Sequence, residues 1–451
     1  MNEKKRASFG SKLGVVAAAA GSAVGLGNIW RFPYELGLSG GGAFLLIYII
    51  CISLLGIPIM TSEFLIGRMG EANAAGSFRK LQPKGSKWWL VGAMGVVAAF
   101  LIMGFYSVVS GWTFEYIAQA IGNNFAHKDS AALEQVFTDF STQTWRPILW
   151  MGLSVAITCL IIIGGVKNGI EKSSKFLMPL LFIIIIILGI RAVTLPGGTE
   201  GLKFLFKPDF SKIDSSVILN AMGQAFFSLS LGMGCMITYG SYIRKDNNLS
   251  KTVAEVTILD TLVAVLASIA IFPAVFSFGI SPGQGPTLVF ITLPNIFASM
   301  AGGYIWAILF FVLLAIAALT SSISLLEVIV AFCVEEFKTT RVKAAIFASI
   351  GIFILGVLAS LSMGVWNDVR IFGLTFFDLF DYITSKILMP LGGILVTLFV
   401  GWVMKKDQVQ AELSSNGRYK TKFFSVYLFL VRYIAPIAII IIFLNELGIR
   451  G

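Results

Sequence analysis

The sequence predicts an all-α membrane protein with about eleven transmembrane helices. Of its 451 residues, 57% are hydrophobic and 13% are charged, with a mean hydropathy of +0.86. A soluble domain cannot bury so many apolar side chains. Two of the apolar segments are interrupted in the middle by glycine and polar residues, which is typical of a transporter and not of a simple anchor.

The apolar segments follow one another with short connections. The first is not a cleaved signal peptide, because it is long, contains Arg31 and lacks a small-x-small processing site. The connection 280–301 has no charged residue and contains three prolines, so we expect it to fold onto the protein as a lid. The predicted spans lie near residues 13–36, 42–67, 88–122, 147–164, 170–194, 215–242, 253–279, 303–333, 344–364, 374–404 and 423–447.

The distribution of positive charge predicts the orientation. The formal net charge is +10, and nucleic-acid binding is excluded because Lys and Arg concentrate in alternate connections, as the positive-inside rule describes. If Lys4, Lys5 and Arg6 are cytoplasmic, an odd number of spans places Gly451 outside. The sequence therefore predicts a multi-pass protein of the inner (plasma) membrane, with a cytoplasmic N-terminus and an extracytoplasmic C-terminus. The connections predicted to be cytoplasmic are 68–87, 167–175, 244–251, 338–343 and 405–422.

Enzyme chemistry has no support in the sequence. The only histidine is His127, and no CxxC, GxSxG, HExxH or Walker motif is present. We therefore predict that the chain is not an enzyme. The cysteines all lie in apolar context and are interpreted as small core residues; they are Cys51, Cys159, Cys235 and Cys333.

Two broken helices predict the organisation of the chain. Residues 21–33 contain three glycines, an Asn, an Arg and a Pro inside an apolar segment, and residues 228–234 contain a similar interruption. An unpaired backbone group in lipid costs several kcal/mol, so each break indicates a ligand site. Each break opens a set of five spans, and an odd-numbered unit gives an inverted repeat. We expect one transmembrane domain, 1–451, with repeats at about 8–195 and 215–405 and an extra span at about 423–447.

Several segments resemble the neurotransmitter:sodium symporter family. They are GLGNIWRFP at 25–33, SGGGAF at 39–44, GQAFFSLS at 223–230, TYGSY at 238–242 and LTSS at 319–322. The resemblance runs from Arg6 to about Asp381 in the family's order. It implies the 5+5 inverted-repeat fold of the family's leucine transporter, with spans 1 and 6 unwound at mid-membrane. It also implies sodium-coupled import of neutral hydrophobic L-amino acids, from aliphatic to aromatic, by alternating access, as in bacterial eleven-span members.

An amino-acid site must satisfy both a carboxylate and an ammonium group. The N–H groups of Leu26 and Gly27, at a half-helix N-terminus, suit the carboxylate. By the resemblance, Tyr106 donates its hydroxyl to the same group. The expected ammonium ligands are carbonyls near Ala23, Phe227, Ser228 and Ser230. An uncharged side-chain pocket is expected from Val24, Ile102, Tyr106, Phe227, Met233, Ser324 and Leu325.

Two sodium sites are predicted, since this hard cation prefers oxygen ligands. The alternative for a Thr-Ser pair alone is a helix-packing contact. The first site groups the Ala23 carbonyl, Asn28, Ser228, Asp260 and the substrate carboxylate. The second groups the carbonyls of Gly21, Val24 and Ala317 with the hydroxyls of Thr320 and Ser321.

Asp260 departs from the leucine transporter, which has Asn there. A lone carboxylate in a span costs about 2.5–3.5 kcal/mol on insertion scales, so a cation or proton should accompany it. Chloride-dependent relatives bind the anion nearby, and we infer that Asp260 replaces chloride. The alternative is a protonated Asp with a packing role. The positions that match the chloride site are Tyr48, Gln224, Ser228 and Ala264.

The resemblance also implies two gates. Arg31 and Asp381 form the outer gate, with Phe227 and Tyr106 as an aromatic lid. Glu63 is expected to accept bonds from unwound backbone, while Glu115 and Glu327 have no assigned role. Two other functions stay open, a chloride-dependent carrier of another small zwitterion and a non-transporting amino-acid sensor. The cytoplasmic gate comprises Arg6, Phe9, Ser241, Tyr242 and Glu335, although the adjacent Glu336 leaves the register ambiguous.

Overall fold

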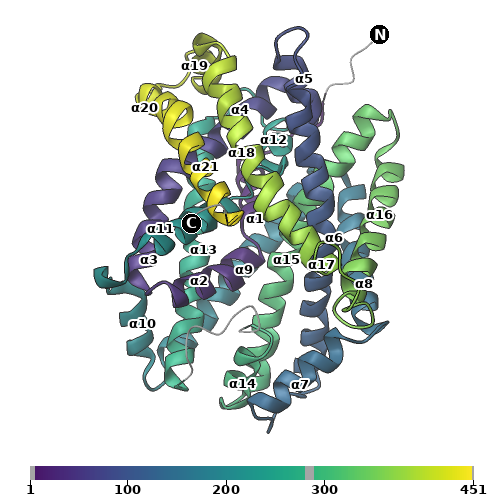
Figure 1. The fold of residues 1–451 in the computed structure, drawn as a ribbon, viewed down its shortest axis with the longest axis vertical. Coiled ribbons are helices and arrows are strands. Elements are labelled where there is room, and N and C mark those ends of the chain that lie inside the picture. Colours follow the sequence, from purple (N-terminus) through teal and green to yellow (C-terminus); the bar gives the residue numbers. More distant parts are fainter. Residues whose placement is uncertain (1–5, 280–288, 449–451) are drawn as a thin grey trace.

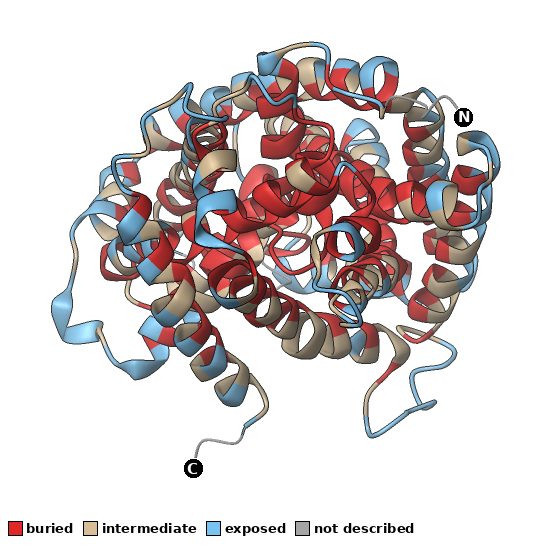
Figure 2. Cartoon of the chain, turned by 90° about the horizontal axis from the view of Figure 1, so that it is seen from above, coloured by how far each residue is buried: buried red, intermediate tan, exposed pale blue. Residues whose placement is uncertain are grey.

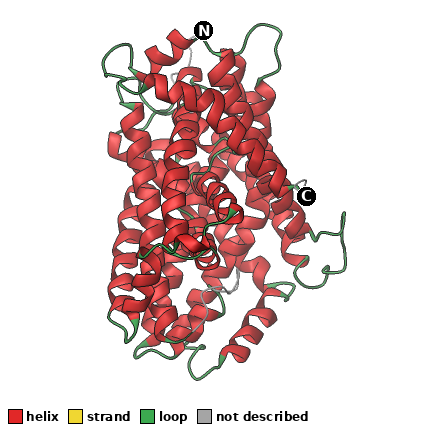
Figure 3. Cartoon of the chain, turned by 60° about the vertical axis from the view of Figure 1, so that its left-hand side comes forward, coloured by secondary structure: helices red, strands yellow, loops and turns green. Residues whose placement is uncertain are grey.

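The computed structural model describes residues 6–279 and 289–448. Within these ranges the chain is helical, with no β-sheet (Figure 3). The helices run roughly along the long axis of the molecule (Figure 1). One end carries α5 (Ala74–Leu81) and α19 (Lys406–Leu413), and the other carries α7 (Ser130–Ser141), α10 (Gly198–Phe206) and α14 (Thr292–Ala298).

Nine helices in the described ranges are long and apolar enough to cross a membrane. Some contain π-helical turns, so that one span holds several elements. The spans are α3 (Gly42–Cys51) with η2 (Ile52–Gly56) and α4 (Ile57–Gly70); α6 (Trp89–Ile121); α8 (Arg146–Ile163); η3 (Val166–Glu171) with α9 (Lys172–Val193); α13 (Leu249–Ser277); α15 (Gly303–Glu336); α16 (Arg341–Leu361); α17 (Phe376–Asp381) with η6 (Tyr382–Leu388), α18 (Met389–Leu398) and η7 (Phe399–Val403); and α20 (Phe424–Phe429) with η8 (Leu430–Ile434) and α21 (Ala435–Glu446).

The first span is broken, as predicted. It consists of α1 (Lys12–Ala23) followed by η1 (Gly27–Arg31) and α2 (Phe32–Leu38), with a bend of 54° between the two parts. Ser11 caps α1 by accepting a hydrogen bond from the Gly14 N–H at 3.0 Å. Val24 leaves the helix in an extended conformation, with φ −70° and ψ 107°.

The sixth predicted span is also broken. It contains α11 (Ser215–Ser228) and α12 (Cys235–Gly240), separated by the non-helical residues 229–234. Each piece is shorter than a complete span. Every one of the predicted ranges therefore contains helix, and the prediction of an all-α membrane protein is confirmed.

The broken helices occupy the buried centre of the molecule (Figure 2). Residues 14–23 of α1 and all of α12 are buried. The peripheral helices instead expose large apolar side chains, including Leu160 on α8, Phe176 on α9 and Phe347 on α16. Such a surface suits contact with the hydrocarbon chains of lipid, which are an apolar environment for these side chains.

Glycines allow α12 to pack directly on the backbone of α4. A Cβ at Gly67 would lie 1.9 Å from the Ile237 carbonyl oxygen, and one at Gly240 would lie 2.7 Å from the Phe64 carbonyl oxygen. Small residues at a helix interface permit this approach in membranes. The contact holds α12, the C-terminal half of the second broken helix, against α4.

We expect Gly67→Ala to destabilise the protein by about 1–3 kcal/mol, because a methyl group at this position forces α4 and α12 apart. Thermal unfolding in detergent measures the effect. Gly223→Ala on α11 is the matched control, since a Cβ there meets no atom within 4 Å. Equal unfolding temperatures for the two variants would contradict the packing argument.

Candidate functional site

The break in the first helix exposes backbone groups of both kinds. The end of α1 leaves carbonyls without intrahelical partners, and the start of the next helix leaves N–H groups. The Gly25 N–H donates to Asn28 Oδ1 at 3.0 Å, and the Leu26 N–H donates to the Tyr106 hydroxyl at 3.3 Å. The predicted partner Tyr106, on α6, therefore lies at the break.

The second break contacts the first. Ser230, with φ +53°, donates its hydroxyl to the Ser22 carbonyl at 2.9 Å. The Gly232 N–H donates to Glu63 Oε1 at 2.7 Å, which is the backbone-support geometry expected for Glu63. Gly232 has φ +80°, and a Cβ there would lie 2.3 Å from the Met389 carbonyl oxygen, so only glycine fits.

Asn28, Ser228 and Asp260 form a first buried oxygen cluster. Asn28 Nδ2 donates to Asp260 Oδ1 at 2.7 Å and to Ser228 Oγ at 3.1 Å. Ser228 Oγ donates to Asp260 Oδ2 at 2.9 Å. None of the three side chains is more than 2% exposed, and Ala23, the fourth predicted member, is the last residue of α1. The structure thus brings the side chains of the first predicted ion site together.

The positions that match the chloride site surround this cluster. Tyr48 is fully buried near Asp260 and Ser228, and its hydroxyl has no hydrogen-bond partner among the described residues. Gln224 Nε2 donates to the Gly27 carbonyl at 3.4 Å, whereas its Oε1 has no hydrogen-bond partner among the described residues. Ala264 is also fully buried, one helical turn after Asp260 on α13.

A second cluster joins α1 to α15. Thr320 Oγ1 donates to the carbonyls of Ala317 at 3.0 Å and Val24 at 3.3 Å, while Ser321 Oγ donates to Val24 at 3.3 Å. A Cβ at Gly21 would lie 3.4 Å from Thr320 Cβ, which places the fifth predicted member at the same contact. The Ser22 carbonyl, 3.4 Å from Ser321 Oγ, is an oxygen that the sequence did not identify. Every residue has a backbone carbonyl, so the residue type at position 22 does not indicate that its carbonyl takes part in the cluster.

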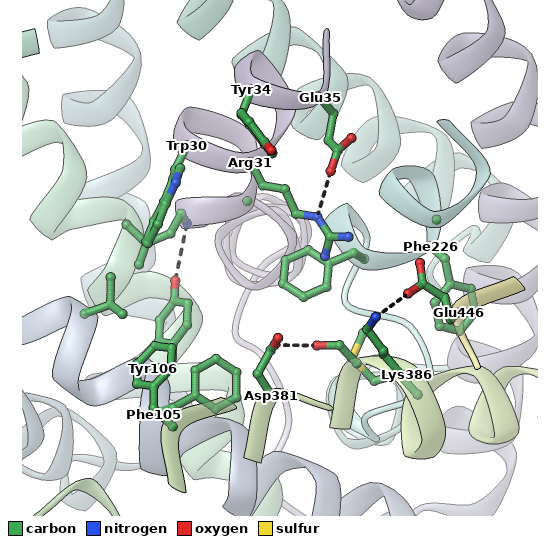
Figure 4. Close-up of a pocket in the computed structure, with 18 of the residues that line it drawn as sticks. Trp30, Arg31, Tyr34, Glu35, Phe105, Tyr106, Phe226, Asp381, Lys386 and Glu446 are labelled. Atoms are coloured by element: carbon green, nitrogen blue, oxygen red, sulfur yellow. Dashed lines mark hydrogen bonds and ion pairs between the residues drawn. The ribbon is translucent and has the colours of Figure 1, made fainter. Parts of the chain in front are cut away.

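A cavity of about 460 Å³ reaches the break in the first helix (Figure 4). Leu26, Gly27, Tyr106 and Phe227 line it, and these are predicted substrate residues. Other predicted substrate residues do not line the cavity. The apolar ones pack against neighbouring side chains in the core, and the three serines are buried because their hydroxyls are hydrogen-bonded to neighbouring groups. The predicted residues outside the cavity lining are Ala23, Val24, Ile102, Ser228, Ser230, Met233, Ser324 and Leu325.

Arg31 and Asp381 line the cavity, but they are not paired in this structure (Figure 4). Arg31 Nε lies 3.8 Å from Glu35 Oε1, and the Arg31 guanidinium lies 4.7 Å from the Phe227 ring centroid. Asp381 Oδ1 accepts a hydrogen bond from Ser385 at 2.8 Å. The predicted outer ion pair is therefore not formed in this structure, because each partner is held by a neighbour on its own side of the cavity.

Arg6 binds at the other end of the broken helices. Its guanidinium donates to Ser241 Oγ at 2.7 and 2.9 Å, forms an ion pair with Glu335 and lies 4.8 Å from the Tyr242 ring centroid. Phe9 packs edge-on against the Tyr242 ring, with 6.0 Å between centroids. This geometry identifies Glu335, and not the adjacent Glu336, as the partner of Arg6.

The neighbouring Glu336 has a different partner. It forms an ion pair with Arg79 at 2.9 Å. Glu335 also accepts a hydrogen bond from the Asn73 N–H at 2.7 Å, so it ties the N-terminal segment to the start of α5.

Ion pairs with partly exposed arginines explain the two buried glutamates without an assigned role. Glu327 accepts the Tyr242 hydroxyl at 2.6 Å and forms an ion pair with Arg341. Glu115 lies 2.7 Å from Arg146 Nη2, which links α6 to α8. A carboxylate inside a span signals a partner, but the sequence does not say which cation supplies it.

The structure describes only part of the connection that was expected to form a lid. Residues 280–288 lie outside the described residues. Phe290, which follows them, is buried and lines the cavity. Its ring lies 5.9 Å from the Trp30 ring and 5.7 Å from the Trp112 ring. This part of the connection therefore packs onto the protein, as the lack of charge predicts.

The sequence and the structure were compared with known proteins. A profile described as the Sodium:neurotransmitter symporter family matches residues 6–138 and 123–449. The sodium-dependent transporter YhdH of Bacillus subtilis is 41% identical over 449 residues, covering 100% of this chain and 99% of its own length. A sodium-dependent transporter of Haemophilus influenzae is also 41% identical, covering 99% of each chain.

A solved structure is similar throughout. The crystal structure of MhsT in complex with L-phenylalanine has a TM-score of 0.89 and 47% sequence identity, covering 98% of this chain and 100% of that one. The leucine-transporter-like fold predicted from the sequence is therefore confirmed. The family match, the similar relatives and the solved structure agree with the two broken helices and the oxygen clusters beside them. The chain therefore belongs to the sodium:neurotransmitter symporter family: it is a multi-pass, sodium-dependent transporter and not an enzyme.

Proposed function

We propose that this protein imports neutral, hydrophobic L-amino acids together with sodium. The observation that carries the proposal is the cavity, which is lined largely by aromatic and aliphatic side chains and ends at the Leu26 N–H and the Tyr106 hydroxyl. A carboxylate suits these donors. The 47% identical MhsT was solved with L-phenylalanine, an amino acid of the expected class.

Met233 and Ser324 would line the side-chain end of the substrate site, with Ile102 and Leu325. All four are uncharged and buried. A charged substrate side chain would therefore meet no compensating charge there, which costs far more than burying an apolar one. This argument favours aliphatic and aromatic substrates.

We assign one coupling ion to each oxygen cluster. In the first cluster, Asp260 supplies the negative charge, the Ala23 carbonyl, Asn28 and Ser228 supply neutral oxygens, and the substrate carboxylate completes the ligands. The Asn28 oxygen that would face the ion accepts the Gly25 N–H in this structure. In the second, every oxygen is a carbonyl or hydroxyl, some at the C-terminal end of α1, where the helix dipole favours a cation, and the others on α15. Sodium is the coupled solute at both sites, and sharing the carboxylate links its binding to that of the amino acid.

Alternating access would use the two ends of the broken helices. The Arg6 network closes the end that carries α5 and α19, while Arg31 and Asp381 stand apart across the cavity. We infer that this arrangement is outward-facing and that Arg31 and Asp381 approach when the outer path closes. The α5 end is then cytoplasmic, as the positive-inside rule favours. The proposed repeats remain 8–195 and 215–405.

Uptake into proteoliposomes should require a sodium gradient. Thr320→Ala should raise the sodium concentration for half-maximal uptake by about tenfold, which corresponds to ~1.4 kcal/mol. Thr397→Ala is the matched control, since this buried threonine also bonds a carbonyl three residues earlier but lies on α18. Full uptake in potassium-only buffer would refute sodium coupling, whereas an equal effect of both variants would refute only the site.

Uptake should persist when gluconate replaces chloride, because the Asp260 carboxylate supplies the charge that offsets sodium in a low-dielectric core. Asp260→Asn keeps an oxygen but removes this charge, so its uptake should fall strongly. Added chloride should partly restore uptake if Tyr48 and Gln224 hold the anion. A strict chloride requirement of the unmutated protein would overturn the proposal and favour the chloride-dependent carrier.

Loss of the Arg6–Glu335 ion pair should favour opening of the closed end. In a variant whose only cysteine is the buried Cys235, Glu335→Gln should speed thiol labelling by roughly fivefold, as expected for an interaction of about 1 kcal/mol. The control is Glu336→Gln, which removes the adjacent ion pair to Arg79. If both substitutions changed the labelling rate equally, Arg6–Glu335 would have no special role in closure.

A further inference from the structure

Arg432 is a basic residue inside an apolar span. It is the ninth residue of the span Phe424–Glu446 and lies in the π-helical turn η8. At 1.5 Å per residue, this places it about 12 Å along the helix from its first residue. Intramembrane arginines are costly and normally face a partner, a cavity or the interface.

The protein holds the Arg432 side chain against the neighbouring helix but does not neutralise it. Arg432 Nε donates to the Gly401 carbonyl at 2.6 Å, and the guanidinium lies 5.6 Å from the Trp402 ring centroid. A Cβ at position 401 would lie 3.0 Å from Arg432 Cγ, so the glycine makes room for the side chain along η7. Within residues 6–279 and 289–448, no carboxylate forms an ion pair with Arg432, and Nη1 and Nη2 have no acceptor.

The Trp402 ring, which lies against the guanidinium, belongs to a group of exposed aromatic side chains. Trp402 is 57% exposed, Tyr433 is 43% exposed, and their rings meet edge to face with 5.5 Å between centroids. Phe429, also exposed, lies 5.5 Å from the Tyr433 ring. Exposed Trp and Tyr are typical of the level where lipid headgroups meet acyl chains. The span that contains Gly401 ends two residues later, at Val403, which fits the same level.

Further positive charge lies near the ends of the two helices whose contact, between η7 and η8, we call the seam. Lys405 and Lys406 follow η7 after one intervening residue, Met404, and Lys420 and Lys422 precede α20. All four are exposed, and none forms an ion pair with a residue that the structure describes. Basic residues at a membrane surface attract anionic lipids, each contributing about 1 kcal/mol.

We propose that the seam between η7 and η8 binds the headgroup of an anionic phospholipid. The two free nitrogens of the Arg432 guanidinium match two phosphate oxygens, a geometry that Lys does not reproduce. Trp402 and Phe429 would contact the upper acyl chains, and the lysines would favour a headgroup with net negative charge. Under the proposed orientation, the lipid belongs to the cytoplasmic leaflet.

Native mass spectrometry of the intact protein with added phosphatidylglycerol tests the site. The unmutated protein should retain the lipid, and Arg432→Gln should weaken its apparent affinity by about fivefold, the change expected for one interfacial arginine. Arg432→Lys should give an intermediate affinity. Arg418→Gln, which removes an exposed arginine from the same end of the molecule, is the matched control and should bind like the unmutated protein.

Two further measurements identify the ligand and guard against misfolding. Phosphatidylcholine should bind more weakly than phosphatidylglycerol, and inorganic phosphate should not displace the lipid. Unchanged phosphatidylglycerol binding by Arg432→Gln, equal binding of both lipids, or displacement by phosphate would each overturn the proposal. If Arg432→Gln does not fold, the comparison of Arg432→Lys with Arg418→Gln decides, because equal affinities in those two variants contradict a bidentate phosphate contact.

Discussion

The structure depends on satisfying the backbone groups that two broken helices release in the middle of a membrane. Lipid offers these groups no hydrogen-bond partner, so each free N–H or carbonyl needs a protein partner, an ion, a solute or water in the cavity. Glu63 accepts a hydrogen bond from the Gly232 N–H, and Tyr106 accepts one from the Leu26 N–H. Ser230 donates its hydroxyl to the Ser22 carbonyl. The breaks lower stability because they free backbone groups, and the same groups become available to bind a solute. Binding and folding therefore depend on the same atoms.

Charge is distributed unevenly around these breaks. The first oxygen cluster contains the fully buried Asp260, whereas the second, with Thr320 and Ser321, contains only neutral oxygens and a helix end. A fixed carboxylate holds a cation whether or not the solute is present, but neutral ligands depend on geometry. If the two clusters bind sodium as proposed, the affinity of the second cluster for the ion would therefore respond most to a small displacement of α1 from α15.

The spans and the breaks could be predicted from the sequence, because long apolar segments indicate membrane helices and glycines at mid-depth indicate interruptions in them. The sequence also identified Asn28, Ser228 and Asp260, which the structure brings together from three distant segments. It could not identify Arg341 or Arg146, since the partner of a buried carboxylate depends on which helices meet. The separation of Arg31 from Asp381 belongs to one conformation, and the sequence does not indicate in which conformation two residues are in contact.

The carbonyl of Ser22 accepts hydroxyls from Ser230 in the second broken helix and Ser321 in α15. One main-chain atom thus joins three separate parts of the protein. No exchange of side chains can delete it, so mutational scanning would score position 22 by its hydroxyl and miss its principal contact. Only a change to the peptide link itself, such as an ester in place of the amide, would weaken this acceptor while leaving every side chain intact.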